Sequence, residues 1–188
     1  MKFEVLTFDL DNTIFDTTPV TREAFKRCHK DFYYGTHFNV HLSYPKDVAD
    51  ELTRLFSDDM WFNTQLLNVE VPYLLNKLNQ YYEVYYVSNR FRESKDSYDQ
   101  LKRNGIDCVI DQVIKLQGDK TPILKKLNTS IHFDDSPHVI EACLQNAINC
   151  HMISNHEMQY NYHLRDKVRY SKDLQEAIMK EKLLEKIK

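Results

Sequence analysis

Short apolar runs alternate with helical patterns along most of this chain, and that alternation constrains the fold more than any other feature. The runs cover residues 2–8, 82–88, 107–110, 130–135 and 150–154. Their length and their β-branched and aromatic residues are typical of buried strands. Strands that alternate with helices form a parallel sheet whose two faces are covered by helices. The sequence therefore predicts an α/β fold built on a parallel sheet.

The segments between these runs carry signals for the ends of helices. Residues 94–104 are followed by Gly105, and glycine commonly ends a helix because it takes a left-handed conformation without strain. The pair Thr121 and Pro122 predicts a helix start, with threonine as the cap and proline in the first turn. Residues 137–147 place their apolar side chains on one helical face, and residues 173–188 predict an amphipathic helix.

Residues 16–71 interrupt the alternation, because they contain helical patterns and no convincing strand. One pattern begins at Thr18 and Pro19. A second has apolar residues at helical spacing, namely Val48, Leu52, Leu55 and Phe56. We therefore expect a helical insertion directly after the first strand, with the core formed by residues 1–15 and 72–188.

The composition excludes several classes of protein. The chain has 188 residues, 42% of them hydrophobic, which suits one domain with a modest insertion. A net charge of −3 favours neither a nucleic-acid polymer nor a membrane surface as partner. Four scattered cysteines without a CxxC pair predict free thiols, and three glycines leave no Gly-rich phosphate loop. The N-terminus does not resemble a signal peptide, so we expect a cytoplasmic protein.

Polar residues stand where the predicted strands end. In an open parallel sheet, ligands bind beyond the carboxyl ends of the strands, so these residues are expected to converge. Carboxylates that converge repel each other unless a cation lies between them, and Mg²⁺ prefers such hard oxygen ligands. The converging residues are Asp9, Asp11, Ser88, Asn89, Asp134 and Asp135, with Lys120 at the start of the helix before the fourth strand.

Each of these features has an ordinary structural explanation when it stands alone. Ser88 suits a helix cap, Lys120 suits a solvated turn, and the pair Asp134 and Asp135 suits a cap before Pro137. The functional interpretation depends on all of them falling at one edge of one sheet.

The stretches "FDLDNT", "VSN", a lone "K" before a helix and "FDDS" occur in that order between residues 5 and 137. As a set they resemble the four motifs of the haloacid dehalogenase superfamily. The resemblance implies a Rossmann-like three-layer core with strand order 5-4-1-2-3. It also implies that residues 16–71 form a small helical cap over the active site.

The resemblance further implies a chemistry. Asp9 would attack phosphorus and form an aspartyl phosphate, and Asp11 would act as the general acid and base. An acid at Asp11 disfavours a dehalogenase, because a halide leaving group needs no proton. Mg²⁺ would be bound by Asp9, the backbone carbonyl of Asp11, Asp134 and, through water, Asp135. The groups expected to bind the phosphoryl oxygens are Ser88, Asn89, Lys120 and Thr13.

Two longer stretches resemble the 5'(3')-deoxyribonucleotidase family. They are "DDMWFNTQLLNVEVPYLLNKLNQYYEVYYVSNR" and "MQYNYHLRDKVRYSKDLQEA". In that family, aromatic residues of the cap hold a nucleobase, which implies this role for Trp61 and Phe62. The alternative for both rings is plain packing in the core of the cap.

Together these features predict a Mg²⁺-dependent phosphomonoesterase that acts on a small phosphorylated metabolite, with a (deoxy)nucleoside monophosphate as the expected substrate. The alternatives are a phosphotransferase or mutase, a sugar-phosphate phosphatase, or a non-catalytic binding protein on the same fold. The sequence leaves the oligomeric state open between monomer and homodimer.

Overall fold

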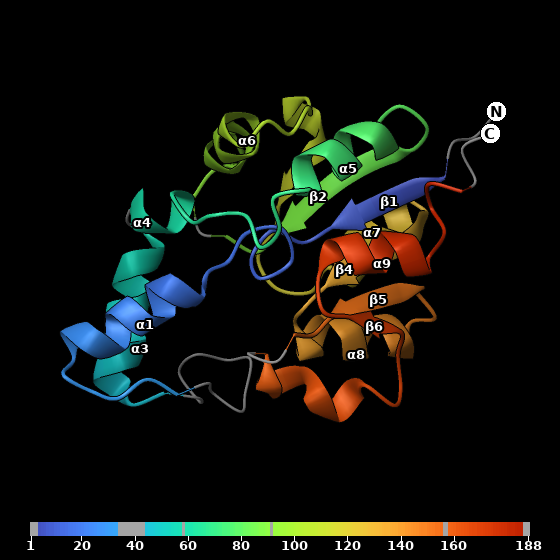
Figure 1. Ribbon diagram of the computed structural model, residues 1–188. Helices are drawn as coiled ribbons and strands as arrows, with labels where there is room; N and C mark the ends of the chain where they lie inside the picture. Colours follow the sequence, from blue (N-terminus) through green and yellow to red (C-terminus); the bar gives the residue numbers. More distant parts are fainter. Residues whose placement is uncertain (1–3, 34–43, 58, 91, 156–157, 186–188) are drawn as a thin grey trace.

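A six-stranded parallel sheet forms the centre of the protein (Figure 1). The computed structural model describes residues 4–33, 44–57, 59–90, 92–155 and 158–185. The sheet order is β3-β2-β1-β4-β5-β6, and each neighbouring pair is parallel. This confirms the predicted order 5-4-1-2-3 and adds a sixth strand beside the fifth. The strands are β1 (Val5–Phe8), β2 (Glu83–Ser88), β3 (Val113–Lys115), β4 (Thr129–Asp134), β5 (Cys150–Ile153) and β6 (Tyr170–Ser171).

The strand predicted at residues 107–110 is wrong. Ile106 is fully buried, but Val109 and Ile110 are 60% and 43% exposed, and residues Ile110–Gln112 form a short 3-10 helix, η1. The edge strand starts at Val113, which is buried and pairs with Tyr86 of β2. A short apolar run therefore did not suffice to locate this strand, because its position depends on the register against β2.

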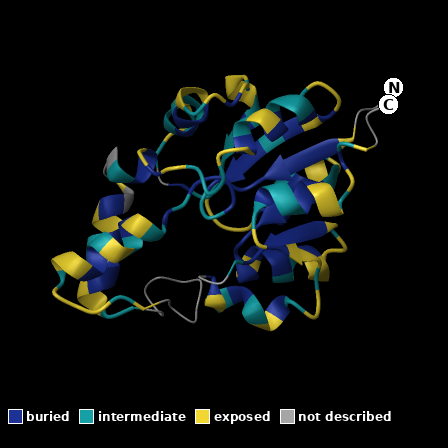
Figure 2. Cartoon of the chain, viewed as in Figure 1, coloured by how far each residue is buried: buried dark blue, intermediate teal, exposed yellow. Residues whose placement is uncertain are grey.

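Helices cover both faces of the sheet, as the alternation predicts (Figure 2). The apolar side chains of α5 (Val71–Leu78), α6 (Ser94–Arg103) and α9 (Leu174–Lys180) join one core cluster with β1, β2 and β4. The second cluster includes α7 (Thr121–Lys126), α8 (Pro137–Gln145) and the 3-10 helix η2 (Gln159–Leu164). These clusters make the three-layer α/β architecture.

Several helix ends follow the sequence signals and others differ. Helix α6 ends as predicted before Gly105, which takes a φ of +76°. Thr121 is the first residue of α7 rather than its cap, because the carboxylate of Asp119 accepts hydrogen bonds from the backbone N–H and the hydroxyl of Thr121. Helix α9 ends at Lys180, before the predicted end of the amphipathic segment.

The insertion after β1 carries helices α1 (Thr18–Arg27), α3 (Lys46–Phe56) and α4 (Asp59–Phe62). Their buried apolar residues form a cluster separate from those of the sheet. In Figure 1 the strand arrows point towards the side on which these helices lie. We call this part the cap; the division of the chain at residues 16 and 71 stays a prediction.

Two linkers join the cap to the core, and they run side by side. The outgoing linker, residues 14–17, follows β1, and the return linker, residues 63–70, leads to α5. The backbone N–H of Asp16 donates to the carbonyl of Gln65 at 2.8 Å, and the N–H of Leu67 donates to the carbonyl of Ile14 at 2.9 Å.

Every helix in the described part of the chain is too short or too polar to cross a bilayer.

Candidate active site

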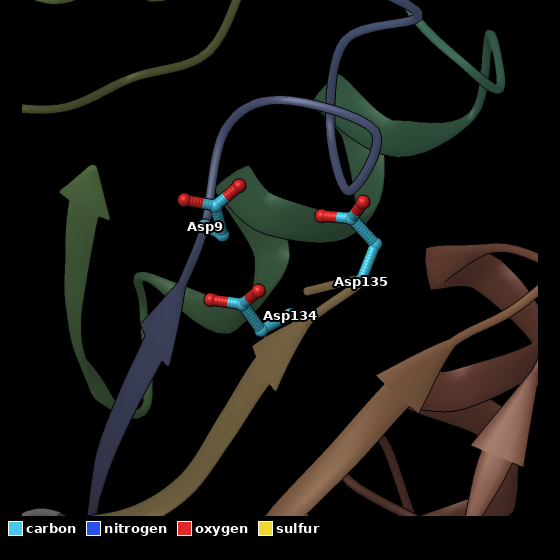
Figure 3. A group of neighbouring side chains, drawn as sticks. All are labelled: Asp9, Asp134 and Asp135. Atoms are coloured by element: carbon cyan, nitrogen blue, oxygen red, sulfur yellow. The ribbon is translucent and has the colours of Figure 1, made fainter. Parts of the chain in front are cut away.

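Three aspartates meet at the carboxyl ends of the two central strands (Figure 3). Asp9 follows β1 directly, Asp134 is the last residue of β4, and Asp135 comes next. Because β1 and β4 are parallel neighbours, their carboxyl ends lie at one edge. Each side chain offers one oxygen, and these oxygens lie within 4.8 Å of one another. All three residues are buried, so the predicted convergence of Asp9, Asp134 and Asp135 is present in the structure.

Lys120 lies among these carboxylates. Its Nζ donates to Oδ1 of Asp9 at 2.5 Å and to Oδ2 of Asp134 at 2.7 Å. The residue directly precedes α7 and is only 3% exposed. Burial lowers the pKa of Lys120, but the charges of Asp134 and Asp9 outweigh this and hold it above the ordinary lysine value. The lysine is therefore a fixed positive charge between two strand ends.

One ammonium group does not balance three buried carboxylates. Burial raises the pKa of Asp9 to about 7, with Asp134 and Asp11 adding to the effect against the Lys120 charge. Burial and the charges of Asp134 and Asp9 raise the pKa of Asp135 well above its ordinary value. The site thus requires a further cation if all its carboxylates are to be ionised. Carboxylate oxygens in this number are ligands that suit Mg²⁺, so the donor set fits that ion.

Asp134 is the exception among the buried carboxylates, because its pKa is lowered to about 2. Burial raises this pKa, but the charge of Lys120 and the hydrogen bond from His132 outweigh burial. His132 Nε2 lies 3.0 Å from Oδ2 of Asp134, and its Nδ1 lies 2.9 Å from the hydroxyl of Thr7. Burial lowers the pKa of His132, which favours a neutral ring that donates through Nε2. Sequence reasoning missed this histidine, although a polar residue inside the run "IHF" was a signal.

Asp135 is held by the segment η2, far from it in sequence. The hydroxyl of Tyr160 donates to Oδ2 of Asp135. The side-chain amide of Asn161 donates to the backbone carbonyls of Asp135 and Ile153, each at 2.8 Å. Asn12, in the loop after β1, donates to the Tyr160 hydroxyl at 3.4 Å. Tyr160 therefore connects both loops of the acidic cluster.

Asp11 pairs with an arginine that sequence reasoning did not assign a role. Arg90 donates to Oδ1 of Asp11 through Nη2 at 2.6 Å, and its Nε lies 3.1 Å from both carboxylate oxygens. The Arg90 side chain is 2% exposed, whereas that of Asp11 is 24% exposed. A buried guanidinium thus binds Asp11, whose side chain remains partly exposed. The motif "VSNR" placed Arg90 at the end of β2, but nothing in it indicated the partner.

The hydroxyls predicted to bind phosphoryl oxygens are buried. Among the residues that the structure describes, Ser88 Oγ and Thr13 Oγ1 have no hydrogen-bond partner. Ser88 ends β2 beside the end of β1, and Thr13 lies in the loop after β1. Asn89 donates to the carbonyl of Gly118 at 3.0 Å, which leaves its Oδ1 unpaired within the described chain. A buried hydroxyl without a partner costs about 1–3 kcal/mol, a cost that a bound oxyanion would remove.

Trp61 and Phe62, the aromatic residues predicted to hold a base, are buried in the cap. They are 6% and 5% exposed and pack in the apolar cluster of the cap. The Phe62 ring also lies against two guanidinium groups, with its centroid 5.3 Å from Cζ of Arg90 and 4.6 Å from Cζ of Arg92. The arrangement matches the alternative interpretation, in which both rings belong to the core of the cap.

Comparisons with known proteins relate this geometry to solved structures. The sequence matches no family model and no curated protein sequence. The fold is similar to that of a protein from Bacteroides fragilis assigned as a haloacid dehalogenase-like hydrolase, with a TM-score of 0.63, 15% identity and coverage of 94% of this chain and 100% of the other.

Two further structures are similar over most of their length. A predicted phosphatase from Clostridium acetobutylicum has a TM-score of 0.59 and 16% identity, with 97% of this chain and 99% of the other covered. A protein from Bacillus subtilis assigned as a HAD-hydrolase and bound to magnesium has a TM-score of 0.56 and 15% identity, with 95% and 98% covered. The chain therefore has the α/β fold of the haloacid dehalogenase-like hydrolases, with its buried acidic cluster at the carboxyl edge of the sheet.

Proposed function

We propose that this protein is a Mg²⁺-dependent phosphomonoesterase that hydrolyses a small phosphorylated metabolite through an aspartyl phosphate. The observation that carries the proposal is the buried group of Asp9, Asp134 and Asp135 around a single lysine at the ends of the central strands. Such a group suits a site that binds a cation together with a phosphate. The phosphatase and magnesium descriptions of the structural neighbours support this interpretation.

The metal would be held by Asp9, Asp134 and Asp135, with the backbone carbonyl of Asp11 as a further ligand. When bound, Mg²⁺ supplies positive charge that neutralises phosphoryl oxygens and favours attack on phosphorus. His132 and Tyr160 orient two of the carboxylates, because each donates to one of them.

Asp9 and Asp11 would perform the chemistry in two steps. In the first step, a carboxylate oxygen of Asp9 forms a bond to phosphorus while the bond from phosphorus to the ester oxygen breaks. The leaving alcohol takes its proton from Asp11. In the second step, Asp11 takes a proton from water as the water attacks phosphorus. This releases inorganic phosphate and regenerates the carboxylate of Asp9.

The remaining polar groups would bind the phosphoryl oxygens. Lys120 already lies 2.5 Å from Asp9, so its charge is close to where negative charge accumulates. The hydroxyls of Ser88 and Thr13 would donate to the same oxygens, which would give each buried hydroxyl the partner that it lacks among the described residues. The side-chain amide of Asn89, the residue after the end of β2, would donate a further hydrogen bond to these oxygens.

The substrate is proposed only as a small phosphate monoester. A nucleoside monophosphate stays a prediction, and so does the contact of its base with Trp61 and Phe62, which are both buried in this structure. A phosphotransferase or mutase would use the same first step but pass the phosphoryl group to a sugar instead of water. A binding protein without catalysis would not turn over any phosphate ester.

A phosphate-release screen separates these possibilities. The panel contains nucleoside monophosphates, sugar phosphates and para-nitrophenyl phosphate, each with MgCl₂ and with EDTA. We expect phosphate release that needs Mg²⁺ and no added acceptor. Asp9→Asn should lower turnover by about a thousandfold or more, a typical scale for the removal of a nucleophile.

The matched control is Asp111→Asn, which removes an exposed carboxylate in η1 and should leave turnover unchanged. Near-normal release by Asp9→Asn would contradict the mechanism. Release that occurs only with an added sugar acceptor would favour the phosphotransferase.

A further inference from the structure

Arg90 is surrounded by polar and aromatic groups that come from both the core and the cap. Its guanidinium is almost fully buried, although it lies at the end of β2 beside the acidic edge. Two of its nitrogens hold Asp11, and Oδ1 of that carboxylate receives the shortest bond, at 2.6 Å. Oδ2 receives only one contact from Arg90, from Nε at 3.1 Å.

The third nitrogen of Arg90 begins a chain of hydrogen bonds towards the cap. Nη1 donates to Oε1 of Gln100 at 2.6 Å, and Gln100 is fully buried on α6. The amide of Gln100 donates to the hydroxyl of Thr64 at 3.1 Å and to its carbonyl at 3.3 Å. Thr64 lies in the return linker, and its hydroxyl donates to the carbonyl of Trp61 in α4 at 3.0 Å. A continuous buried path thus joins Asp11 to the last helix of the cap.

Two aromatic rings lie against the guanidinium of Arg90, one from the outgoing linker and one from the end of α4. The Phe15 ring belongs to the outgoing linker, with its centroid 5.5 Å from Cζ of Arg90. The Phe62 ring belongs to α4, immediately before the return linker, with its centroid 5.3 Å away. Phe15 also forms a β-bridge with Leu66 of the return linker. Arg90 therefore occupies the point where both linkers meet the core.

We infer that Arg90 is the positioning residue of Asp11, and that it couples this carboxylate to the cap through Gln100 and Thr64. The inference rests on the proposed function, in which Asp11 transfers protons. Arg90 acts through Asp11, because it orients the carboxylate so that one oxygen faces the leaving group. A planar guanidinium is required, since it contacts Asp11, Gln100 and both rings at once, whereas a lysine is a single point charge.

The position of the cap thereby affects proton transfer. These hydrogen bonds fix the orientation of Asp11 only while Thr64 contacts Gln100 of α6 and the Phe62 ring contacts Arg90. A displacement of the return linker would remove the partner of Gln100 and one face of the guanidinium, and the carboxylate would lose its fixed orientation. Proton donation matters most for esters with poor leaving groups, so the effect should depend on the substrate.

The test compares an alkyl phosphate that the screen identifies with para-nitrophenyl phosphate, whose leaving group needs little protonation. Arg90→Lys should lower kcat for the alkyl ester by about tenfold to a hundredfold, a typical cost of misplacing a catalytic group, with little change in KM and a much smaller loss on the aryl ester. Thr64→Val keeps the side-chain shape and removes the hydroxyl, and it should cause a smaller loss of the same kind. The control is Arg92→Lys, because Arg92 also stacks on Phe62 but pairs with Asp96 instead of Asp11.

A second measurement separates positioning from a structural role. Asp11→Asn alone and Asp11→Asn combined with Arg90→Lys should have similar kcat values, because two residues that act as a unit are not additive. Additive losses, or equal losses on both esters, would overturn the positioning role. A normal Thr64→Val variant would overturn the coupling to the cap. Absence of phosphate release by the wild type in the same assay would instead reject the proposed function, and this inference with it.

Discussion

Four aspartates gather at one sheet edge, yet each has a different set of neighbours, and these neighbours decide what the residue can do. A neighbouring ammonium group favours the charged form of a carboxylate, whereas burial among other carboxylates favours its protonated form unless a cation binds. Residue type alone would have made these side chains equivalent. The pairs are Asp9 with Lys120, Asp134 with His132 and Lys120, Asp135 with Tyr160, and Asp11 with Arg90.

Tyr160→Phe tests the role of the tyrosine at this scale. The change removes the hydroxyl that donates to Asp135 and leaves a buried carboxylate without that donor. Loss of a partner that orients a metal ligand typically weakens metal binding by about tenfold to a hundredfold. We therefore expect a higher Kd for Mg²⁺, measured by isothermal titration calorimetry.

Tyr162→Phe is the matched control, because Tyr162 lies in the same short helix and its ring stacks on Arg165. Its Mg²⁺ affinity should equal that of the wild type. An unchanged Kd in Tyr160→Phe would show that Asp135 needs no such orientation to bind the ion.

At the scale of elements, the ends of β1 and β4 create the candidate site, and the linkers of the cap meet beside it. Parallel strands bring residues that are 125 positions apart into hydrogen-bond contact, as Thr7 and His132 show. Backbone hydrogen bonds between the outgoing and return linkers hold the cap helices on the carboxyl side of the sheet. The helices of the cap in turn pack on each other around their own apolar cluster.

The rings of Trp61 and Phe62 are expected to stabilise the cap. If both are core residues of the cap, Trp61→Ala and Phe62→Ala should each lower the free energy of unfolding by about 3–5 kcal/mol, the usual cost of removing a buried ring. Urea unfolding measures this loss. Activity should fall on nucleotide and aryl phosphates together, because the whole cap is disturbed.

The control is Tyr73→Ala on α5, whose side chain is 61% exposed, so its free energy of unfolding should change by less than about 0.5 kcal/mol. The opposite pattern would support the nucleobase-binding interpretation: normal stability, a raised KM for a nucleoside monophosphate and an unchanged KM for para-nitrophenyl phosphate.

At the scale of the whole molecule, helix α9 and the residues after it pack against β5 and β6, the last two strands of the sheet. Glu181, just after α9, lies with Oε1 2.6 Å from Nδ1 of His151 in β5, and Nε2 of His151 lies 2.8 Å from the hydroxyl of Ser171 in β6. His151 is fully buried. Arg169 pairs with the other carboxylate oxygen of Glu181 at 3.0 Å. Polar contacts around the buried His151 thus connect the residue after α9 to the last two strands.

This arrangement predicts how stability changes with pH. Burial lowers the pKa of His151 below its ordinary value of 6.5, against the opposing effect of Glu181, while the charges of Arg169 and Lys180 lower it further. The unfolded chain therefore binds more protons than the folded one in the interval between the two pKa values. The stability that neutral His151 contributes is complete above about pH 6.5 and is lost as the pH falls through the lower, folded-state pKa.

His151→Gln isolates this contribution, because glutamine keeps a donor and an acceptor but does not titrate. The difference in free energy of unfolding between wild type and variant should shrink as the pH is lowered from about 7.5 to 5.5 in urea titrations. Groups that are remote from His151 titrate alike in both proteins, so they cancel in the comparison. A difference that stays constant or grows on acidification would contradict a neutral buried histidine.

The sequence by itself determined the class of fold and the residues at the strand ends, because these follow from local patterns: apolar runs, helix ends and the position of Asp9 and Asp134 where a strand ends. The order of the first five strands was implied by the resemblance of the motifs to a known superfamily. Only the tertiary structure decided the place of β3, the burial of Trp61 and Phe62, and the partners of the carboxylates. Arg90 lies 79 positions from Asp11, and Tyr160 lies 25 from Asp135. No local pattern carries such pairings, because they arise from strand register and from the packing of segments that are distant along the chain.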